Sequence, residues 1–355
     1  MEAQNNPILQ EDLEIIAHSN IDFKKLENST ILITGATGLI GSHLVKTIAC
    51  INRVHDLECT IILLVRNLDK ANAIFGTLLE RSDVNVIVGD VTQPYEKYLD
   101  SSVKIDYIFH AAAITNSKIM VEKPVDTIYT SLEGCKQMLE LAKEKNVSSF
   151  VYISSMEVYG TFSENETTLV SEEKIGYLNP LLVRSNYPES KRMCENLAIA
   201  YASQFGLNIK IARLSQTFGA GILPGENRVF AQFAKCALDR KDIVLHTTGE
   251  SEGNYCYTRD TVSALLILLN KGVSGQAYNI SNPNSHISIY NMARFVAENI
   301  AEGQIDVIFD IPEQNIYGYA APTKMKLDSS KMQELGWEPQ VDLLESYQRM
   351  IASLK

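Results

Sequence analysis

A strand-length apolar run that leads directly into a regularly spaced glycine turn constrains the fold of this chain most. The run is Thr30–Thr34 (TILIT), and glycines follow it at three-residue spacing, at Gly35, Gly38 and Gly41. The residues from Gly38 to Cys50 have helical periodicity, so the glycines fall in a strand-to-helix turn. Glycine permits a sharp turn, and it lets a pyrophosphate reach bare N–H groups at the helix N-terminus. The stretch predicts a dinucleotide site in the first βα unit of a sheet.

Further short apolar runs alternate with helical patterns over the following residues. Strands are predicted at Thr60–Val65, Val84–Val88, Tyr107–His110, Phe150–Ser154 and Asn208–Ala212, and helices at Glu133–Lys145 and Tyr187–Phe205. Near-continuous apolar strands separated by helices are typical of a parallel sheet covered on both faces. The pattern predicts an α/β, doubly wound (Rossmann) dinucleotide-binding domain over residues 30–215.

The two ends of the chain have different patterns. Residues 1–29 carry apolar residues at roughly helical spacing, which predicts a helical extension packed on the outside of the core. Beyond residue 216 we expect shorter elements: helices at Arg228–Leu238, Thr261–Lys271, Ile289–Ala301 and Leu343–Ile351, and a strand at Ile243–His246. We expect residues 216–355 to form mainly a smaller C-terminal substrate-binding lobe, with residues 257–271 returning to the Rossmann domain.

Composition and charge exclude several classes of protein. The net charge of −11 argues against a general nucleic-acid or anionic-membrane binder, although a small anionic ligand stays possible. The longest apolar run, Ala264–Leu269, is too short to span a bilayer, and no signal peptide is visible. The six cysteines include no C-x-x-C pair, so we expect reduced thiols, no metal site and a cytoplasmic location.

Further stretches match one family pattern. They are GDVT at Gly89–Thr92, HAAA at His110–Ala113, SSMEVYG at Ser154–Gly160, YPESK at Tyr187–Lys191 and LGWEP at Leu335–Pro339. With the G-x-x-G-x-x-G spacing, they make the chain from Thr30 onward resemble the extended short-chain dehydrogenase/reductases, in particular the NAD-dependent epimerase/dehydratase family. The resemblance implies a nicotinamide cofactor, and a homodimer formed through the helices at Glu133–Lys145 and Tyr187–Phe205.

The resemblance also assigns residues to the cofactor. They are Gly35, Thr37, Gly38, Leu39, Ile40, Gly41, Arg66, Asp90, Val91, Ala111, Ala112, Ala113, Tyr187, Lys191 and Leu214. Arg66 stands at the end of the second predicted strand, where an NAD enzyme of this fold has a carboxylate for the ribose 2′-OH. An arginine there suits the 2′-phosphate of NADP, or it stacks on adenine or lies at the surface. NAD and NADP both stay open.

The predicted catalytic residues lie in two segments. Tyr187 and Lys191 are four residues apart in a helical stretch, so both face the same way. A free phenol titrates near ~10, and an adjacent ammonium favours the phenolate. The resemblance implies that Tyr187 accepts the proton, that Lys191 tunes it and holds the ribose, and that Ser155 binds the reacting oxygen. Glu157 is either a second acid/base, as in dehydratases and decarboxylases, or a solvated loop carboxylate.

Candidate substrate-binding residues come from a closer likeness to UDP-glucuronate decarboxylases. They are Ser155, Arg184, Gln216, Arg228 and Arg259. Arg184 and Arg228 match arginines of that subfamily, and a guanidinium suits carboxylate or phosphate. Gly253 stands where the family has an arginine for the substrate diphosphate, so Arg228 or Arg259 would have to replace it.

These observations predict an enzyme that modifies a nucleotide-activated sugar through a transient keto-sugar and hydride transfer. An NADP-dependent carbonyl reductase on the same fold is the first alternative, favoured by Arg66, Met156 and Gly253. A non-catalytic nucleotide-binding regulator is the second.

Overall fold

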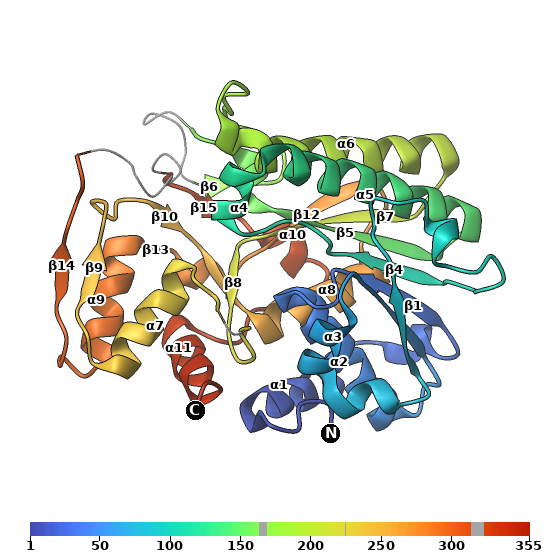
Figure 1. Cartoon of the computed structure of the whole chain (residues 1–355), viewed down its shortest axis with the longest axis horizontal. Helices are drawn as coiled ribbons and strands as arrows, with labels where there is room; N and C mark the ends of the chain where they lie inside the picture. Colours follow the sequence, from blue (N-terminus) through green and yellow to red (C-terminus); the bar gives the residue numbers. More distant parts are fainter. Residues whose placement is uncertain (163–168, 224, 314–322) are drawn as a thin grey trace.

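A central parallel sheet organises the computed structural model, which describes residues 1–162, 169–223, 225–313 and 323–355. Within these ranges the sheet has seven strands in the order β12-β7-β5-β4-β1-β2-β3, and every neighbouring pair is parallel (Figure 1). The strands are β1 (Thr30–Thr34), β2 (Thr60–Val65), β3 (Val84–Val88), β4 (Tyr107–His110), β5 (Ser149–Ser155), β7 (Ile209–Leu214) and β12 (Gln276–Ile280). The predicted doubly wound α/β fold is confirmed.

Helices cover both faces of this sheet. One face carries α1 (Pro7–Ala17), α2 (Leu39–His55), α3 (Leu68–Phe75) and α8 (Thr258–Lys271), and the other carries α5 (Pro124–Lys145) and α6 (Asn186–Phe205) (Figure 1). Successive strand residues point to opposite faces, so Ile31 and Ile33 pack into the core under α2 and α8, while Leu32 packs into the core under α5 and α6. This two-sided burial explains why the strands are almost continuously apolar.

More of the C-terminal half returns to the sheet than the predicted residues 257–271. The edge strand β12 was not predicted, because Gln276 and Asn279 interrupt its short apolar pattern. Asn279 is nevertheless buried, and its side chain accepts a hydrogen bond from Tyr159 and donates to backbone oxygens. Trp337 and Met332 also join the core under α8. The Rossmann domain therefore takes in more of the C-terminal half than residues 257–271.

The remaining residues form a smaller lobe beside the sheet (Figure 1). Its elements include α7 (Val229–Asp239), α9 (Ile289–Asn299), α11 (Leu343–Ala352), β9 (Ile243–Leu245) and β14 (Val307–Phe309). Their core is aromatic: the ring of Phe218 lies 4.8 Å from that of Phe230 and 5.1 Å from that of Tyr347. The other short elements are α4 (Ser117–Glu122), β6 (Leu169–Val170), β8 (Gln216–Phe218), β10 (Glu252–Gly253), β11 (Tyr255–Tyr257), β13 (Ile287–Ser288), β15 (Lys326–Leu327) and α10 (Ser330–Gln333).

None of the helices in the described ranges combines the length and the apolar composition that a bilayer crossing requires.

The N-terminal extension attaches the two lobes to each other. Asp12 on α1 is 2% exposed, and its carboxylate lies 3.1 Å from Arg259 of α8 and 2.8 Å from Arg349 of α11. The hydroxyl of Tyr257 donates to the same carboxylate at 2.6 Å. Because α8 covers the sheet and α11 belongs to the smaller lobe, this buried ion pair joins both through α1.

Replacing Asp12 by Ala should destabilise the protein by about 3 kcal/mol, because two largely buried guanidinium groups lose a shared partner. Urea unfolding followed by circular dichroism measures the change. Glu11→Ala is the matched control: Glu11 also pairs with Arg349 but is exposed, so its loss should cost less than about 1 kcal/mol. Equal effects of both substitutions would contradict the proposed role of Asp12.

Candidate active site

Backbone contacts shape the glycine turn at the end of β1. Gly35 has a φ of +64°, and a Cβ built on it would lie 2.6 Å from the carbonyl oxygen of Ala111. A Cβ on Gly41 would lie 2.3 Å from the carbonyl oxygen of Gly35. A Cβ on Gly38 would have more room, because the nearest atom, the carbonyl oxygen of Gly35, would lie 3.2 Å away. Only glycine therefore lets β1, α2 and the segment after β4 approach this closely.

The predicted cofactor residues gather at the carboxyl edge of the sheet. Arg66 follows β2, Asp90 follows β3, and Ala111–Ala113 follow β4, beside the glycine turn. Arg66 and Asp90 both line a cavity of about 450 Å³, together with Thr92, Ile114, Ile119, Lys123, Asp126, Tyr129 and Thr130. A bare turn at the N-terminus of a 17-residue helix, next to such a cavity, fits the pyrophosphate and adenosine of a dinucleotide.

The other predicted cofactor residues flank this edge. Thr37, Leu39 and Ile40 are half-buried in the turn and the first turn of α2. Val91 is buried beside Gly134 of α5: a Cβ built on Gly134 would lie 3.0 Å from the Val91 side chain. Leu214 ends β7 and pairs in register with Ser155 at the end of β5. The sheet thus places Leu214 beside the predicted catalytic serine.

Tyr187 and Lys191 lie on successive turns of α6 and are both buried, at 6% and 3% exposure. The ammonium of Lys191 donates to the carbonyl oxygen of Ile153 at 2.7 Å and lies 5.8 Å from the centroid of the Tyr187 ring. Burial lowers the pKa of Lys191. Burial, and next the charge of Glu157, raise the pKa of the Tyr187 phenol, while its hydrogen bond with Ser155 lowers that pKa only in part. Burial thus disfavours the charged form of both groups.

Charged side chains from three other segments surround the Tyr187 phenol. Glu157 follows β5, and its carboxylate forms an ion pair with Arg184 at 2.9 Å. The charges of Arg184 and Arg228 both lower the pKa of the phenol, so both act on the same group. Arg228 is itself paired with Glu226 at 2.6 Å. The structure therefore brings Ser155, Glu157 and two of the predicted arginines to the tyrosine.

The other two predicted substrate residues have contacts of their own. Gln216 is half-buried in β8 and pairs with Tyr255 of β11. Arg259 does not replace the missing arginine, because its guanidinium is buried against Asp12 of the N-terminal extension. The position of Gly253 does belong to the site: a Cβ there would lie 3.7 Å from the methyl group of Met156, beside Ser155.

A buried network behind the site was not predicted. Glu195, one turn after Lys191 on α6, pairs with Arg213 of β7 at 2.7 Å and accepts a hydrogen bond from Ser154. Arg213 also donates to the hydroxyl of Tyr159. These contacts fix the end of β5 against α6, and so fix Ser155 relative to Lys191. The sequence could have indicated this network through the spacing of Lys191 and Glu195, which are four residues apart.

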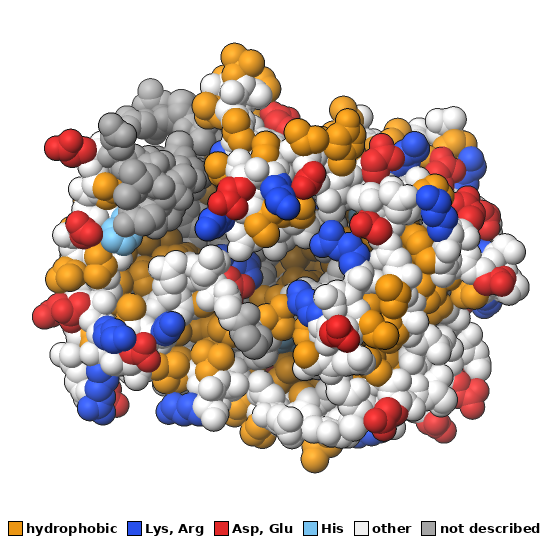
Figure 2. Space-filling model, in the orientation of Figure 1, with side chains coloured by type: hydrophobic (Ala, Val, Ile, Leu, Met, Phe, Trp, Pro, Cys, Tyr) orange, Lys and Arg blue, Asp and Glu red, His pale blue; other side chains and the backbone are white. Residues whose placement is uncertain are grey.

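A hollow lies between the two lobes in the view of Figure 2, and several Lys or Arg side chains stand around it. Acidic side chains also stand near the hollow, but the basic ones can contact an anion directly even though the net charge of the chain is negative. A small anionic ligand is therefore compatible with the hollow.

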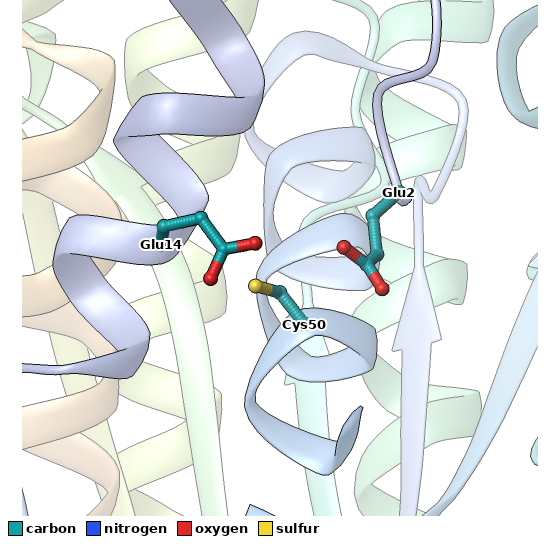
Figure 3. Close-up of side chains that lie close together, drawn as sticks. All are labelled: Glu2, Glu14 and Cys50. Carbon is teal, nitrogen blue, oxygen red and sulfur yellow. The ribbon is translucent and has the colours of Figure 1, made fainter. Parts of the chain in front are cut away.

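One group of possible metal ligands lies between the N-terminal extension and α2. Glu2, Glu14 and Cys50 bring ligand atoms within 4.8 Å of one another (Figure 3). The guanidinium of Arg53 contacts all three side chains, and Arg81 also pairs with Glu2 at 2.9 Å. Burial, with the nearby carboxylates, raises the pKa of the Cys50 thiol to about 12. These contacts make the group an ion-pair network that attaches the extension to α2.

Replacing Gly35 by Ala should remove bound dinucleotide and lower Tm, because the new methyl group would overlap the Ala111 backbone. Gly76→Ala is the matched control. Gly76 also has a positive φ, +51°, but a Cβ there meets nothing within 4 Å, so this variant should keep its dinucleotide and lose about 1 kcal/mol. Thermal unfolding and the nucleotide released by acid test both variants. A Gly35→Ala protein with full nucleotide content would contradict the assignment of the turn.

Comparison with known proteins agrees with this geometry. The chain is 32% identical over 320 residues to UDP-glucuronic acid decarboxylase 6 of Arabidopsis thaliana, covering 90% of this chain and 86% of that protein. It is 26% identical over 332 residues to dTDP-D-glucose 4,6-dehydratase of Bos taurus, covering 90% and 87%. The fold is similar to the solved structure of UDP-glucose 4-epimerase from Thermotoga maritima, with a TM-score of 0.74, 21% identity and coverage of 92% and 98%.

The model of one protein family matches most of the chain. The match to "NAD dependent epimerase/dehydratase family" spans residues 31–281, from the first residues of β1 to the end of β12. The chain therefore belongs to the NAD-dependent epimerase/dehydratase family and is an enzyme of that type.

Proposed function

We propose that this protein converts a nucleotide-activated sugar by oxidising a ring hydroxyl, changing the neighbouring carbon and returning the hydride. The observation that carries the proposal is the convergence of Ser155, Glu157, Arg184 and Arg228 on the buried phenol of Tyr187. The names of the relatives support this substrate class, since they act on UDP- and dTDP-sugars.

Each residue of the site has a role in this reaction. Tyr187 removes the proton of the ring hydroxyl, and Ser155 donates a hydrogen bond to the oxygen as it becomes a ketone. The ammonium of Lys191 stabilises the phenolate. A nicotinamide bound at this site would supply the acceptor of the hydride and its later donor. The ketone acidifies the neighbouring position, where Glu157 serves as the second acid/base.

Glu157 favours decarboxylation or dehydration over simple epimerisation, because those reactions need an acid/base beside the tyrosine. Met156 cannot donate a proton, which opposes a dehydratase that uses an acid at that position. Of the two reactions, we therefore favour decarboxylation.

The runner-up is an NADP-dependent carbonyl reductase. Arg66 supports it, because the guanidinium lines the same cavity as Asp90 and suits a 2′-phosphate. The apolar side chain of Met156, whose methyl group would lie 3.7 Å from a Cβ built on Gly253, supports it as well. A reductase consumes NADPH stoichiometrically, whereas the sugar-modifying enzyme shows no net change of its nucleotide.

We further infer a homodimer through the outer faces of α5 and α6. Large apolar side chains are exposed there, including Val125, Met193 and Phe205. Sedimentation velocity of the purified chain tests this interface.

The six cysteines are all free thiols, which supports a reducing, cytoplasmic setting.

Replacing Tyr187 by Phe should lower kcat about 10²- to 10⁴-fold and leave the nucleotide content unchanged, because the proton acceptor is lost while the fold is kept. The measurement is mass spectrometry of products from a panel of UDP-, CDP-, GDP- and dTDP-sugars, including UDP-glucuronate. Tyr177→Phe, at an exposed tyrosine, is the matched control and should keep full activity. Unchanged turnover in the Tyr187 variant would refute the catalytic assignment.

Denaturing the purified protein should release NAD rather than NADP, as expected from the family. Arg66→Ala should then change NAD affinity less than about threefold. If Arg66 instead binds a 2′-phosphate, the same variant should lose NADP affinity about tenfold or more, since a charge-assisted contact disappears. Release of NADP by the wild-type protein would favour the reductase.

A further inference from the structure

We propose that Arg184 is a positioning residue for Glu157, holding its carboxylate beside Tyr187, and is not a substrate ligand. This inference rests on the proposed function, because it gives Glu157 the role of second acid/base. It differs from the prediction made from sequence similarity, which placed Arg184 on the substrate.

Both carboxylate oxygens of Glu157 lie near the same guanidinium nitrogen of Arg184. One guanidinium nitrogen of Arg184 lies 2.9 Å from Oε2 and 3.2 Å from Oε1 of Glu157. The side chains are 21% and 31% exposed, so water screens the pair only partly. The backbone N–H of Glu157 also donates to the Ser155 hydroxyl oxygen at 3.2 Å. Glu157 is thus fixed at its backbone by Ser155 and at its carboxylate by Arg184.

The segment that carries Arg184 is itself anchored on both sides. The Ser185 hydroxyl donates to the carbonyl oxygen of Asn179 at 2.7 Å. The side-chain amide of Asn186 donates to the carbonyl oxygens of Met120 and Val183. Arg184 therefore presents its guanidinium from a fixed backbone, as a positioning residue requires.

The second arginine near the phenol has a different partner. Arg228 is paired with Glu226, whose carboxylate also accepts the backbone N–H groups of Asn227 and Arg228. Glu226 is therefore held by its own backbone even without a guanidinium. Among the described residues, no backbone N–H donates a hydrogen bond to the Glu157 carboxylate. The position of this carboxylate therefore depends on Arg184.

Charge balance around the phenol follows from these pairs. Glu157 and Arg184 face Tyr187 from the segments before α6, Arg228 faces it from the start of α7, and Lys191 lies on its own helix. Removing Arg184 releases Glu157, so the phenol loses a positive and a negative neighbour together. Removing the charge of Glu157 alone leaves the positive charges of Arg184 and Arg228 near the phenol and lowers its pKa. The pH profile of the reaction should therefore move clearly only in the Glu157 variant.

A double-mutant cycle on the holoenzyme tests the proposal, with UDP-glucuronate or whichever panel sugar the wild-type protein converts. Arg184→Met should lower kcat about 10- to 100-fold, with KM within about threefold, because Glu157 is misplaced. The ascending limb of the pH–kcat profile should move to lower pH in Glu157→Gln and stay close to that of the wild-type protein in Arg184→Met. The double variant should be no slower than Glu157→Gln alone, since Arg184 acts through Glu157. Arg184→Lys should recover part of kcat.

Other results would overturn the proposal. If Arg184 binds substrate, Arg184→Met raises KM at little cost in kcat, and the two losses multiply in the double variant. Arg294→Met removes a comparable ion pair, that with Glu298 on the distant α9, and should change neither parameter.

A measurement without substrate separates this inference from the proposed function. In a crystal structure of Arg184→Met, the Glu157 carboxylate should have left its place beside Tyr187. A carboxylate that keeps its place would refute the positioning role. Failure of the wild-type protein to convert any sugar in the panel would refute the proposed function instead.

Discussion

The close approach of the glycine turn to the end of β4 is the contact on which the rest of the site depends. Gly35 meets the backbone of Ala111, and Gly41 meets that of Gly35, at distances that no larger residue permits. This contact seats the N-terminus of α2 directly above the sheet and leaves its N–H groups open. Strands β2, β3 and β4 then end around the same point, because neighbouring parallel strands share one carboxyl edge.

Burial gives the catalytic segment its chemistry. A phenol and an ammonium enclosed this deeply both favour their neutral forms, so the phenolate, once formed, is a stronger base and the ammonium a stronger acid than in water. The surrounding groups come from separate segments: Ser155 from the end of β5, Arg184 from the loop before α6 and Arg228 from the smaller lobe. The smaller lobe thus contributes a charged side chain to the site. The chemistry depends on how the two lobes meet.

Sequence patterns predicted the sheet better than the site. Strands β1 to β4 have the predicted bounds, because burial on both faces leaves an unbroken apolar run. The edge strand β12 escaped prediction because buried Asn279 looks polar in sequence. Arg259 was assigned to substrate because its partner, Asp12, is 247 residues away. The ion pair of Arg184 with Glu157 was also missed, because irregular segments carry no periodicity that reveals which side chains meet.

The contact between α1 and α11 has a mechanical consequence. The side chain of Asn6 donates to the carbonyl oxygen of Ser353, so the two ends of the chain touch (Figure 1). Together with the ion pair of Asp12 and Arg349, this contact fastens the smaller lobe at the side where the termini lie. Any rotation of one lobe against the other would therefore be smallest at this side, and the width of the hollow would change most at the rim farthest from the termini.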